Sequence, residues 1–343
     1  MNPTLGDVSR LLEGLREKRV LVTGGTGSFG RTLVELCLKH SQAREIVVFS
    51  RDEQKHVAIR REFADGRLKL FVGDIRDVER LRLAMRGINL VFNAAAIKHV
   101  PLTEQHPMEA VQTNILGCHN VCQVALEAGV EALVSLSTDK AVEPVNVMGM
   151  TKALHERVVA SFAGQGMRVA IVRYGNVLAS NGSVVPYFAQ LLQSGVLELP
   201  VTDRRMTRFC LSLQESVQLV LHALTRGEDG GTYVLDLPAF RIWDLAEVMA
   251  ESGSRPDRPV RVRESGIRPG EKLHESLIST EEMRRAAREG SVFRIARYRS
   301  GDETFAPARQ EKALTSDTVR LMTKPEIADL LRNNDLLPVR SRP

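Results

Sequence analysis

Cysteines and aromatic residues are scarce in this chain of 343 residues. It contains four cysteines, one tryptophan and 5% aromatic residues in all. Cys37, Cys118, Cys122 and Cys210 show no paired spacing, which excludes a disulfide framework and is typical of a reducing cytoplasm. Cys118 and Cys122 stand one helical turn apart with His119 between them, yet no second pair of zinc-ligand spacing follows. We therefore expect buried helix cysteines and no metal site.

Long apolar runs and dense clusters of one charge are also missing. No apolar run reaches the roughly 20 residues that a membrane helix needs, and charges occur throughout Met1 to Val20, where a signal peptide would be apolar. The formal net charge of +5 comes from scattered Lys and Arg, without a basic stripe that alternates with aromatic residues. These absences favour a soluble, cytoplasmic protein with no membrane or nucleic-acid partner. An anionic small ligand explains the positive charge better.

Strands alternate with helical patterns through the first half of the chain. The β-branched, apolar runs are Arg19 to Gly25, Glu45 to Ser50, Leu68 to Asp74, Ile88 to Ala96, Ala132 to Thr138 and Arg168 to Val177. This alternation predicts an α/β fold, a Rossmann-type doubly wound parallel sheet with helices on both faces. Ligands of such sheets lie at the carboxyl ends of the strands. The chain is also long enough for a smaller lobe beside the main domain.

The first strand runs directly into a glycine-rich turn, TGGTGSFG, followed by an amphipathic helix. Gly24, Gly27 and Gly30 have the spacing that permits a tight turn, close approach of a pyrophosphate and close packing of the helix. A purely structural turn is the alternative, but the flanking strand and helix favour a dinucleotide site. The other expected cofactor contacts in this turn are Thr26, Ser28 and Phe29.

The end of the second strand indicates which dinucleotide binds. An NAD site usually places an acidic residue there for the ribose hydroxyls, whereas this chain has Ser50 and Arg51 first and Lys55 one turn later. We therefore predict NADP, with Arg51 and Lys55 on the 2′-phosphate. In the alternative, both cations are solvated and Asp52 binds the ribose. The contacts expected from later strand ends are Asp74 and Ile75 at the adenine, and Ala94, Ala95 and Ala96 along the inner ribose and the nicotinamide.

A further cluster lies in the stretch LSTDKAVEPVNVMGMTKALHE. Met148 and Lys152 have the spacing of the Tyr-x-x-x-Lys pair of short-chain dehydrogenases, but methionine stands in place of the tyrosine. The two residues lie four apart and should share one face of a helix that begins near Asn146. Because a thioether cannot act as a base, either the chemistry is lost or it is done by Asp139 and Lys140 just upstream.

Eight blocks of sequence carry a family resemblance, over about Lys18 to Ser279. They are TGGTGSFG, SRDEQK, GDIRD, AAIKHVP, LSTDKAVEPVNVMGMTKA, RYGNVLASNGSVVPYF, MTRF and IRPGEKLHESLIS. In this order and spacing they resemble the extended short-chain dehydrogenase/reductases, specifically the inverting UDP-N-acetylglucosamine 4,6-dehydratases of bacterial polysaccharide assembly. The chain looks most similar to the capsule and O-antigen branch, in which methionine replaces the catalytic tyrosine.

The resemblance implies a reaction and a role for each residue. A hydride leaves C4 of the sugar for NADP, water is lost across C5 and C6, and the hydride returns to C6 with C5 inverted. Asp139 is the expected acid for the C6 hydroxyl, and Lys140 the expected base at C5 if desolvation and nearby cations lower its pKa. Thr138 should hydrogen-bond the C4 oxygen, Lys152 should bind the nicotinamide ribose, and Met148 should pack beside it. Lys140 must then also take the C4 hydroxyl proton, through Thr138 or water.

Several alternatives remain open at this point. Asp139 and Lys140 could form only a salt bridge at a strand end. Sugar dehydratases that retain the C5 configuration generally carry Asp-Glu here and C4 epimerases lack the pair, so Asp-Lys favours the inverting reaction. The rival functions are a catalytically silent NADP-binding protein that lost the tyrosine, and a UDP-hexosamine C4 epimerase.

The chain becomes richer in Pro and Arg after Val177. We expect residues 1–177 to form the NADP-binding domain with 209–245 returning to it, 178–208 and 256–279 to form a substrate-binding lobe, and 280–343 to form a tail with short helices at EEMRRAAREG and TKPEIADLLRNN. By resemblance, the substrate contacts are Lys98, His99, Asn176, Val184, Arg208, Arg268 and Glu271. Guanidinium groups suit a diphosphate and a carboxylate suits ribose hydroxyls, whereas surface salt bridges are the alternative for either arginine. Relatives commonly form hexamers, so a homo-oligomer is also expected.

Overall fold

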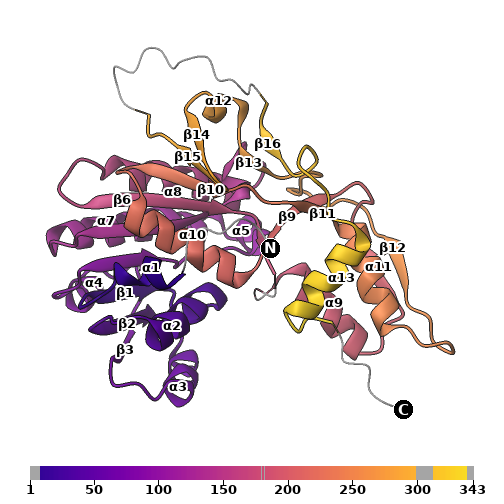
Figure 1. The fold of residues 1–343 in the computed structure, drawn as a ribbon, viewed down its shortest axis with the longest axis horizontal. Coiled ribbons are helices and arrows are strands. Elements are labelled where there is room, and N and C mark those ends of the chain that lie inside the picture. The colour runs from indigo at the N-terminus through magenta and orange to yellow at the C-terminus, as the bar shows by residue number, and fades with distance from the viewer. Residues whose placement is uncertain (1–7, 179, 181, 299–311, 338–343) are drawn as a thin grey trace.

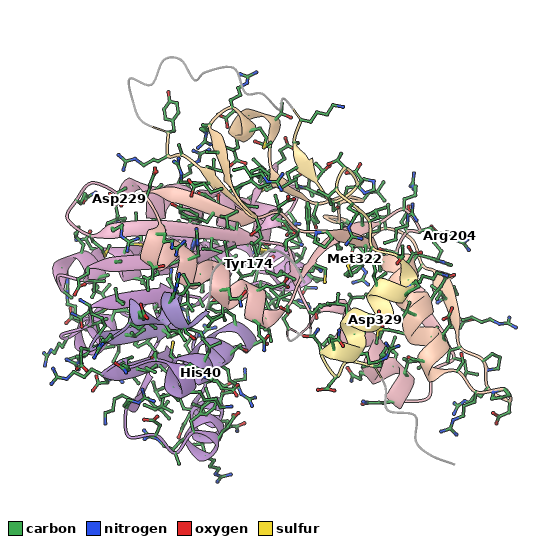
Figure 2. The ribbon with its side chains drawn as sticks, viewed as in Figure 1. His40, Tyr174, Arg204, Asp229, Met322 and Asp329 are labelled. Carbon is green, nitrogen blue, oxygen red and sulfur yellow. The ribbon has the colours of Figure 1, made fainter. Side chains whose placement is uncertain are left out.

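The structure is a computed structural model that describes residues 8–178, 180, 182–298 and 312–337. The positions outside the described residues are 1–7 and 338–343 at the two ends, 179 and 181 in the predicted lobe, and 299–311 in the predicted tail. Figure 1 shows a large domain built on a sheet and a smaller lobe beside it. Side chains fill both parts in Figure 2, where His40 and Asp229 mark the large domain and Arg204 and Asp329 the lobe.

A nine-stranded sheet forms the centre of the large domain, in the order β14-β15-β10-β6-β5-β4-β1-β2-β3. Neighbours from β10 to β3 are parallel, and β15 and β14 add an antiparallel edge. The order β3-β2-β1-β4-β5-β6 is that of a dinucleotide-binding doubly wound fold, as predicted. The strands are β1 (Arg19–Thr23), β2 (Glu45–Ser50), β3 (Leu68–Val72), β4 (Leu90–Asn93), β5 (Ala132–Thr138), β6 (Arg168–Tyr174), β10 (Gly231–Leu235), β14 (Ala286–Glu289) and β15 (Val292–Ile295).

Helices cover both faces of this sheet. One face carries α1 (Val8–Glu13), α2 (Ser28–His40) and α10 (Leu213–Arg226), whose apolar residues join a single core with the strands. The other face carries α4 (Val78–Ala84), α7 (Cys118–Glu127) and α8 (Val147–Ser161). Because the central strands are buried on both faces, their sequences are mainly apolar, and this is why the sequence predicts them so closely. The remaining helices of the domain are α3 (Glu53–Glu62), α5 (Val100–Gln105), α6 (Pro107–Ala110) and the π-helix η1 (Val111–Gly117).

The smaller lobe has a core of its own. It contains a three-stranded sheet of β7 (Asn176–Val177), β9 (Thr207–Leu211) and β11 (Ala239–Arg241), and a two-stranded sheet of β8 (Glu198–Val201) and β12 (Arg261–Glu264). Its helices are α9 (Val184–Gln193), α11 (Ile242–Gly253) and α13 (Lys324–Asn333). The lobe therefore differs from the predicted bounds. Strands β9 and β11 and helix α11 contribute apolar side chains to the lobe core, although they fall wholly or partly within the predicted return to the main domain, and α13 packs there although it belongs to the predicted tail.

The C-terminal region also differs from the prediction of short polar helices. In the stretch EEMRRAAREG only the beginning belongs to a helix, α12 (Thr280–Met283), while β14 follows and pairs antiparallel with β15. The prediction of a helix through residue 290 was wrong because β15 offers a sheet edge, and strand pairing outweighs the helix propensity of these charged residues. The predicted helix in TKPEIADLLRNN is present as α13, and β13 (Ser276–Ile278) pairs with β16 (Leu314–Thr315). Within the described residues, no helix combines the length and apolar character that crossing a bilayer requires.

Candidate active site

The end of β5 carries the residues expected to transfer protons. Asp139 and Lys140 follow the strand in a short 3-10 turn, η2 (Asp139–Ala141). Helix α8 begins beside this turn after Asn146, whose side chain accepts from the backbone N–H of Gly149 at 2.8 Å. Gly149 allows close contact, because a Cβ there would stand 2.2 Å from the Lys140 carbonyl oxygen. The Asp-Lys pair is therefore fixed against the first turn of α8.

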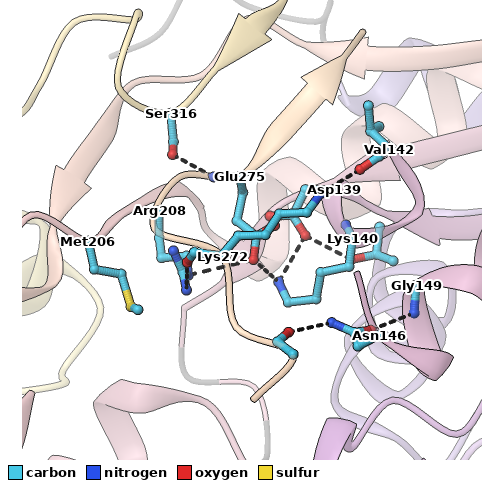
Figure 3. Close-up of polar contacts among 12 residues, drawn as sticks. Asp139, Lys140, Val142, Asn146, Gly149, Met206, Arg208, Lys272, Glu275 and Ser316 are labelled. Atoms are coloured by element: carbon cyan, nitrogen blue, oxygen red, sulfur yellow. Dashed lines mark hydrogen bonds and ion pairs between the residues drawn. The ribbon is translucent and has the colours of Figure 1, made fainter. Parts of the chain in front are cut away.

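Asp139, Lys140 and Glu275 form a charge cluster, shown in Figure 3. Lys140 Nζ lies 3.0 Å from Asp139 Oδ1 and 3.0 Å from Glu275 Oε1. Thr138 Oγ1 donates a hydrogen bond to Asp139 Oδ1 at 2.9 Å. The two carboxylates are 0% and 2% exposed, whereas the Lys140 side chain keeps 23% exposure. One ammonium thus lies between two buried carboxylates at the strand end where the fold places ligands.

Mutual attraction sets the protonation of this cluster. Burial raises the pKa of Asp139, and the charge of Glu275 raises it further, against the lowering effect of Lys140. Burial alone would lower the pKa of Lys140, but Asp139 and Glu275 raise it by more, so it lies above its ordinary value. Burial likewise opposes ionisation of Glu275, but Lys140 and Arg208 hold the pKa of this carboxyl below its ordinary value. The expectation of a lowered Lys140 pKa was wrong, since two carboxylates face the amine and outweigh the cation Arg208.

Arg208 fixes the segment that carries Glu275. Its guanidinium is buried and donates to the carbonyl oxygens of Thr207 (2.7 Å), Leu273 (3.0 Å) and Lys272 (3.0 Å), and its Nε lies 3.8 Å from Glu275 Oε1. The predicted contact of Arg208 with a diphosphate stays a prediction. In the structure, its hydrogen bonds hold the 272–275 backbone against β9.

Two further bonds tie the same segment to the Asp-Lys turn. Lys272 Nζ donates to the Val142 carbonyl oxygen at 2.6 Å, and Asn146 Nδ2 donates to the Gly270 carbonyl oxygen at 2.8 Å. The segment before β13 therefore closes over the carboxyl end of β5 from the lobe side.

Helix α8 brings Met148 and Lys152 to the same side of the helix, as expected from their spacing. Both are buried, at 4% and 5% exposure. Lys152 Nζ donates to the Leu136 carbonyl oxygen at 2.5 Å, and burial lowers the pKa of this amine to about 8. Met148 therefore occupies a core position at the site without offering a group that could exchange a proton.

Unpartnered polar atoms gather around this cluster. Among the described residues, few buried side-chain oxygens lack a hydrogen-bond partner, and Asp139 Oδ2, Glu275 Oε2, Asn176 Oδ1 and Ser183 Oγ are four of them. All four come from the region where the lobe meets the carboxyl ends of β5 and β6. Because buried polar groups in folded proteins are normally paired with protein groups or with ordered water, this concentration fits a site that takes up polar groups of a ligand or water.

The glycine-rich turn has the geometry of a dinucleotide site. Gly24 adopts a left-handed φ of 64°, and a Cβ there would stand 2.9 Å from Ala95 N and 3.0 Å from the Ala94 carbonyl. Gly27 is the N-cap residue of α2 and makes no side-chain capping hydrogen bond, and a helix N-terminus that follows a glycine turn favours an anion. Gly30 lies against Gly25, with 2.5 Å between an added Cβ and the Gly25 Cα. These residues fit a bound pyrophosphate.

The residues after β2 bear on the choice of dinucleotide. Thr26 Oγ1 and Ser50 Oγ lie 2.6 Å apart, which joins the glycine turn to the end of β2. The Asp52 side chain caps α3 by accepting from Lys55 N at 3.0 Å, and Lys55 Nζ lies 3.1 Å from the same carboxylate. The carboxylate of Asp52 is thus turned toward its own helix. Arg51 is about half exposed and lies 3.5 Å from Asp74.

The remaining predicted contacts lie around the charge cluster and the glycine-rich turn. Ser28 and Phe29 begin α2, Ile75 is buried below the end of β3, and Ala96 follows β4. Lys98 and His99 are exposed before α5, and Val184 begins α9. Arg268 is exposed and its Nε lies 3.9 Å from Glu271 Oε1, on the segment that closes over the site. All of these lie on loops or element ends along the carboxyl edge of the sheet or on the facing lobe.

Sequence reasoning missed Glu275 and Lys272. Both belong to the IRPGEKLHESLIS block, in which Glu275 directly precedes the fully buried strand β13. A charged residue joined to a buried strand is a usable signal, because such a residue needs a buried partner of opposite charge. The identity of that partner, Lys140, depends on the tertiary fold alone.

The chain is similar in sequence to proteins that act on nucleotide sugars. A family model described as polysaccharide biosynthesis protein matches residues 20–297. An inverting UDP-N-acetylglucosamine 4,6-dehydratase of Campylobacter jejuni is 43% identical over 270 residues, covering 78% of this chain and 79% of that protein. A protein of Rickettsia akari named UDP-glucose 4-epimerase is 41% identical over 319 residues, covering 90% and 92%.

Solved structures also resemble most of this chain. The structure of Pen from Bacillus thuringiensis superposes with a TM-score of 0.87 at 33% identity, covering 94% of this chain and 99% of that one. The dTDP-glucose 4,6-dehydratase DesIV from Streptomyces venezuelae, with NAD and TYD bound, has a TM-score of 0.67 at 25% identity, covering 74% and 86%. The family match and these identities show that the chain belongs to the polysaccharide biosynthesis proteins of the extended short-chain dehydrogenase/reductase family.

Proposed function

We propose that this protein is an NADP-dependent UDP-N-acetylglucosamine 4,6-dehydratase that inverts C5 and supplies a UDP-4-keto-6-deoxy-hexosamine for bacterial surface polysaccharide. The observation that carries the proposal is the contact of Asp139 and Lys140 at the end of β5, with Thr138 bonded to the same carboxylate. An acid, an amine and a hydroxyl lie together there. A reaction that eliminates water needs all three, whereas a redox reaction alone does not.

Each residue has a separate task in this proposal. The nicotinamide supplies the redox chemistry when bound, removing a hydride from C4 and returning it to C6. Thr138 hydrogen-bonds the C4 oxygen, and its own hydroxyl leads the C4 proton to Asp139. Asp139 thus replaces Lys140 as the proposed acceptor of this proton, because the two carboxylates beside Lys140 raise its pKa and keep it an ammonium. Lys140 removes the C5 proton, which the neighbouring ketone makes acidic. Asp139, whose pKa is raised by burial, protonates the departing C6 hydroxyl.

NADP is the proposed cofactor because of the residues after β2. Asp52 caps α3, which turns its carboxylate away from the role of binding a ribose, and the half-exposed guanidinium of Arg51 stands nearest to the strand end. Guanidinium groups bind phosphate through paired, charge-assisted hydrogen bonds. DesIV, which is 25% identical, was solved with NAD bound, so it supports a dinucleotide here without deciding between NAD and NADP.

The nucleotide sugar is proposed to lie between the sheet edge and the lobe. Asn176 Oδ1 is buried and unpartnered there, and Arg268 with Glu271 lies on the segment that covers the cluster. A cation for the diphosphate and a carboxylate for the ribose suit a uridine diphosphate. Self-association of the protein and the contacts of Lys98, His99 and Val184 are proposed on the family resemblance alone.

A C4 epimerase is the second candidate, because proteins named UDP-glucose 4-epimerase align over more of this chain than the named dehydratases do. An epimerase returns the hydride to C4 and needs no acid for the C6 hydroxyl. A catalytically silent NADP-binding protein is the third candidate, since Met148 cannot exchange a proton. The buried Asp139–Lys140–Glu275 cluster favours the dehydratase over both, because neither rival uses these charges.

The test is incubation of the purified protein with NADP and UDP-N-acetylglucosamine, followed by mass spectrometry of the nucleotide sugar. The proposal predicts loss of one water, and proton NMR of the product should show inversion at C5. Conversion without a change of mass would indicate the epimerase. No conversion of this or related UDP-hexosamines would leave the silent NADP-binding protein.

A further inference from the structure

We propose that Glu275 completes a proton relay with Lys140 and Asp139, and that this relay does the work of the tyrosine whose position Met148 occupies. The inference rests on the proposed dehydratase function and adds a residue to it. Glu275 acts through Lys140, so it is a positioning and relay residue rather than one that contacts the sugar.

The position of Glu275 is fixed from several sides. Its backbone N–H donates to Ser316 Oγ at 2.9 Å, and the Ser316 N–H donates back to the Glu275 carbonyl oxygen at 2.8 Å. Its Oε1 contacts Lys140 Nζ at 3.0 Å, while its buried Oε2 has no partner. A buried carboxylate held in this way with one free oxygen is able to take up a proton without moving.

The charged groups around Lys140 come from four places. Asp139 is on the same turn, Glu275 precedes β13, Arg208 lies on β9, and Lys272 is on the covering segment. The two carboxylates contact the amine directly. The charge of Arg208 lowers the pKa of both Lys140 and Glu275, and Lys272 lowers the pKa of Glu275.

A count of protons shows why a third group is needed. At rest, Asp139 and Glu275 are carboxylates and Lys140 is an ammonium. Oxidation at C4 releases the hydroxyl proton, which passes through Thr138 to Asp139 and makes that carboxyl neutral. At this stage Lys140 remains an ammonium, so it cannot act as a base at C5. A protein with only Asp139 and Lys140 would have to lose a proton to solvent before it could continue.

Glu275 resolves this problem by taking the extra proton. Once Asp139 is neutral, the ammonium has lost one of its two stabilising charges, so an Nζ–H bond of Lys140 breaks and an O–H bond forms on Glu275 Oε1. The free amine then removes the C5 proton. The C5–H electron pair forms the C5=C6 double bond, the C6–O bond breaks, and Asp139 protonates the hydroxyl, which leaves as water.

The relay then returns to its resting state. Lys140 is again an ammonium, Asp139 again a carboxylate, and Glu275 holds one additional proton. Inversion requires the new C5 proton to reach the opposite face of the ring, so it comes from solvent and not from Lys140. Glu275 loses its proton through Lys140, whose 23% exposure gives access to water. One proton enters from solvent and one leaves.

The first test follows exchange of the C5 proton with deuterated solvent as a function of pH in the wild type and in Glu275→Gln. Wild-type exchange should change little between about pH 6.5 and 8.5, because the relay keeps the proton inside the site. Glu275→Gln should be slower by about 10²–10⁴ at neutral pH. It should recover about tenfold per pH unit as solvent removes the Lys140 proton, up to the pKa of Lys140. Glu275→Asp keeps the carboxylate and should retain the flat profile.

A purely structural role gives a different result. Uniform slowing of Glu275→Gln at every pH, or no slowing, would overturn the relay. Glu131→Gln is the matched control, because it neutralises a glutamate that pairs with Lys18 at 2.7 Å on the surface, and it should behave as the wild type.

The second test needs neither sugar nor turnover. The pKa of Lys140 is measured in the substrate-free protein from the pH dependence of its labelling by an amine reagent, read by peptide mass spectrometry. Loss of an opposite charge at this distance should lower the pKa of Lys140 in Glu275→Gln by about 1–3 units. An unchanged pKa would overturn the inference even if the enzyme is a dehydratase. Conversely, a wild type that releases no water refutes the proposed function, and the relay with it, even where the pKa falls as expected.

Discussion

Replacing Arg51 by alanine tests the proposed choice of NADP. The guanidinium is about half exposed and its nearest charged partner, Asp74, lies 3.5 Å away, so the group is available to bind a phosphate. A lost hydrogen bond to a charged group costs about 1.5–3 kcal/mol. Solvent screening of a half-exposed cation favours the lower end of this range.

The expected result for Arg51→Ala is therefore selective. About 1.5 kcal/mol corresponds to a roughly tenfold higher Kd for NADP, whereas the Kd for NAD, which lacks the 2′-phosphate, should stay within about twofold. Isothermal titration calorimetry of the cofactor-free protein with each dinucleotide measures both values. Arg82→Ala is the matched control, since Arg82 is a similarly exposed arginine that pairs with Glu79 and Glu127 away from the glycine turn. Equal losses for NADP and NAD would show that Arg51 does not bind the 2′-phosphate.

Three further predictions follow from the same geometry. Met148→Leu keeps an apolar side chain of similar size, so turnover should fall less than tenfold and the free energy of unfolding by less than about 1.5 kcal/mol; abolished turnover would mean that the sulfur has a role. Lys140→Ala should abolish C5 exchange with deuterated solvent, because the base at C5 is gone; Asp139→Asn should lose about 10²–10⁴ in C5 exchange and in water release alike, because the group that takes the C4 proton and then protonates the C6 hydroxyl is gone; normal exchange in Lys140→Ala would show that another group is the base. Burial opposes ionisation of Glu282, but hydrogen bonds from Arg173 lower its pKa to about 2. Its stabilising effect is therefore complete above the unfolded pKa of about 4.3 and is lost as pH falls toward about 2. In Glu282→Gln, the unfolding free energy from urea titrations should depend less on pH over this range. An unchanged pH dependence would contradict the lowered pKa of Glu282.

The central sheet was predictable because its physical signal is local. Strands such as β2 and β5 are buried on both faces, so their interiors carry no charged residue and each has the predicted bounds. The glycine turn is local in the same way, since the left-handed φ of Gly24 and the close contact of Gly30 are requirements of single positions. The edge strand β14 was missed because its charged residues carry no apolar pattern, and only the neighbouring β15 makes it a strand.

The protonation of the site was not predictable in the same way. Sequence spacing places Asp139 and Lys140 together, but the sign of the Lys140 pKa shift depends on Glu275, which the chain brings in from a distant segment. By resemblance Arg208 was expected to contact the nucleotide sugar, with its guanidinium suited to the diphosphate, whereas the structure gives its hydrogen bonds to three backbone carbonyls. Residue type indicates which chemistry is available, and the tertiary contacts decide where it is used.

The central claim is that the protein removes water across C5 and C6 of a UDP-hexosamine. The most direct measurement is the reaction of UDP-N-acetylglucosamine with the NADP-loaded protein in deuterated water, followed by mass spectrometry and NMR of the nucleotide sugar. The proposal predicts a product that has lost one water and carries one solvent deuterium at C5, with the C5 configuration inverted. A product of unchanged mass with no deuterium at C5 would contradict it, because conversion would then have occurred at C4 alone.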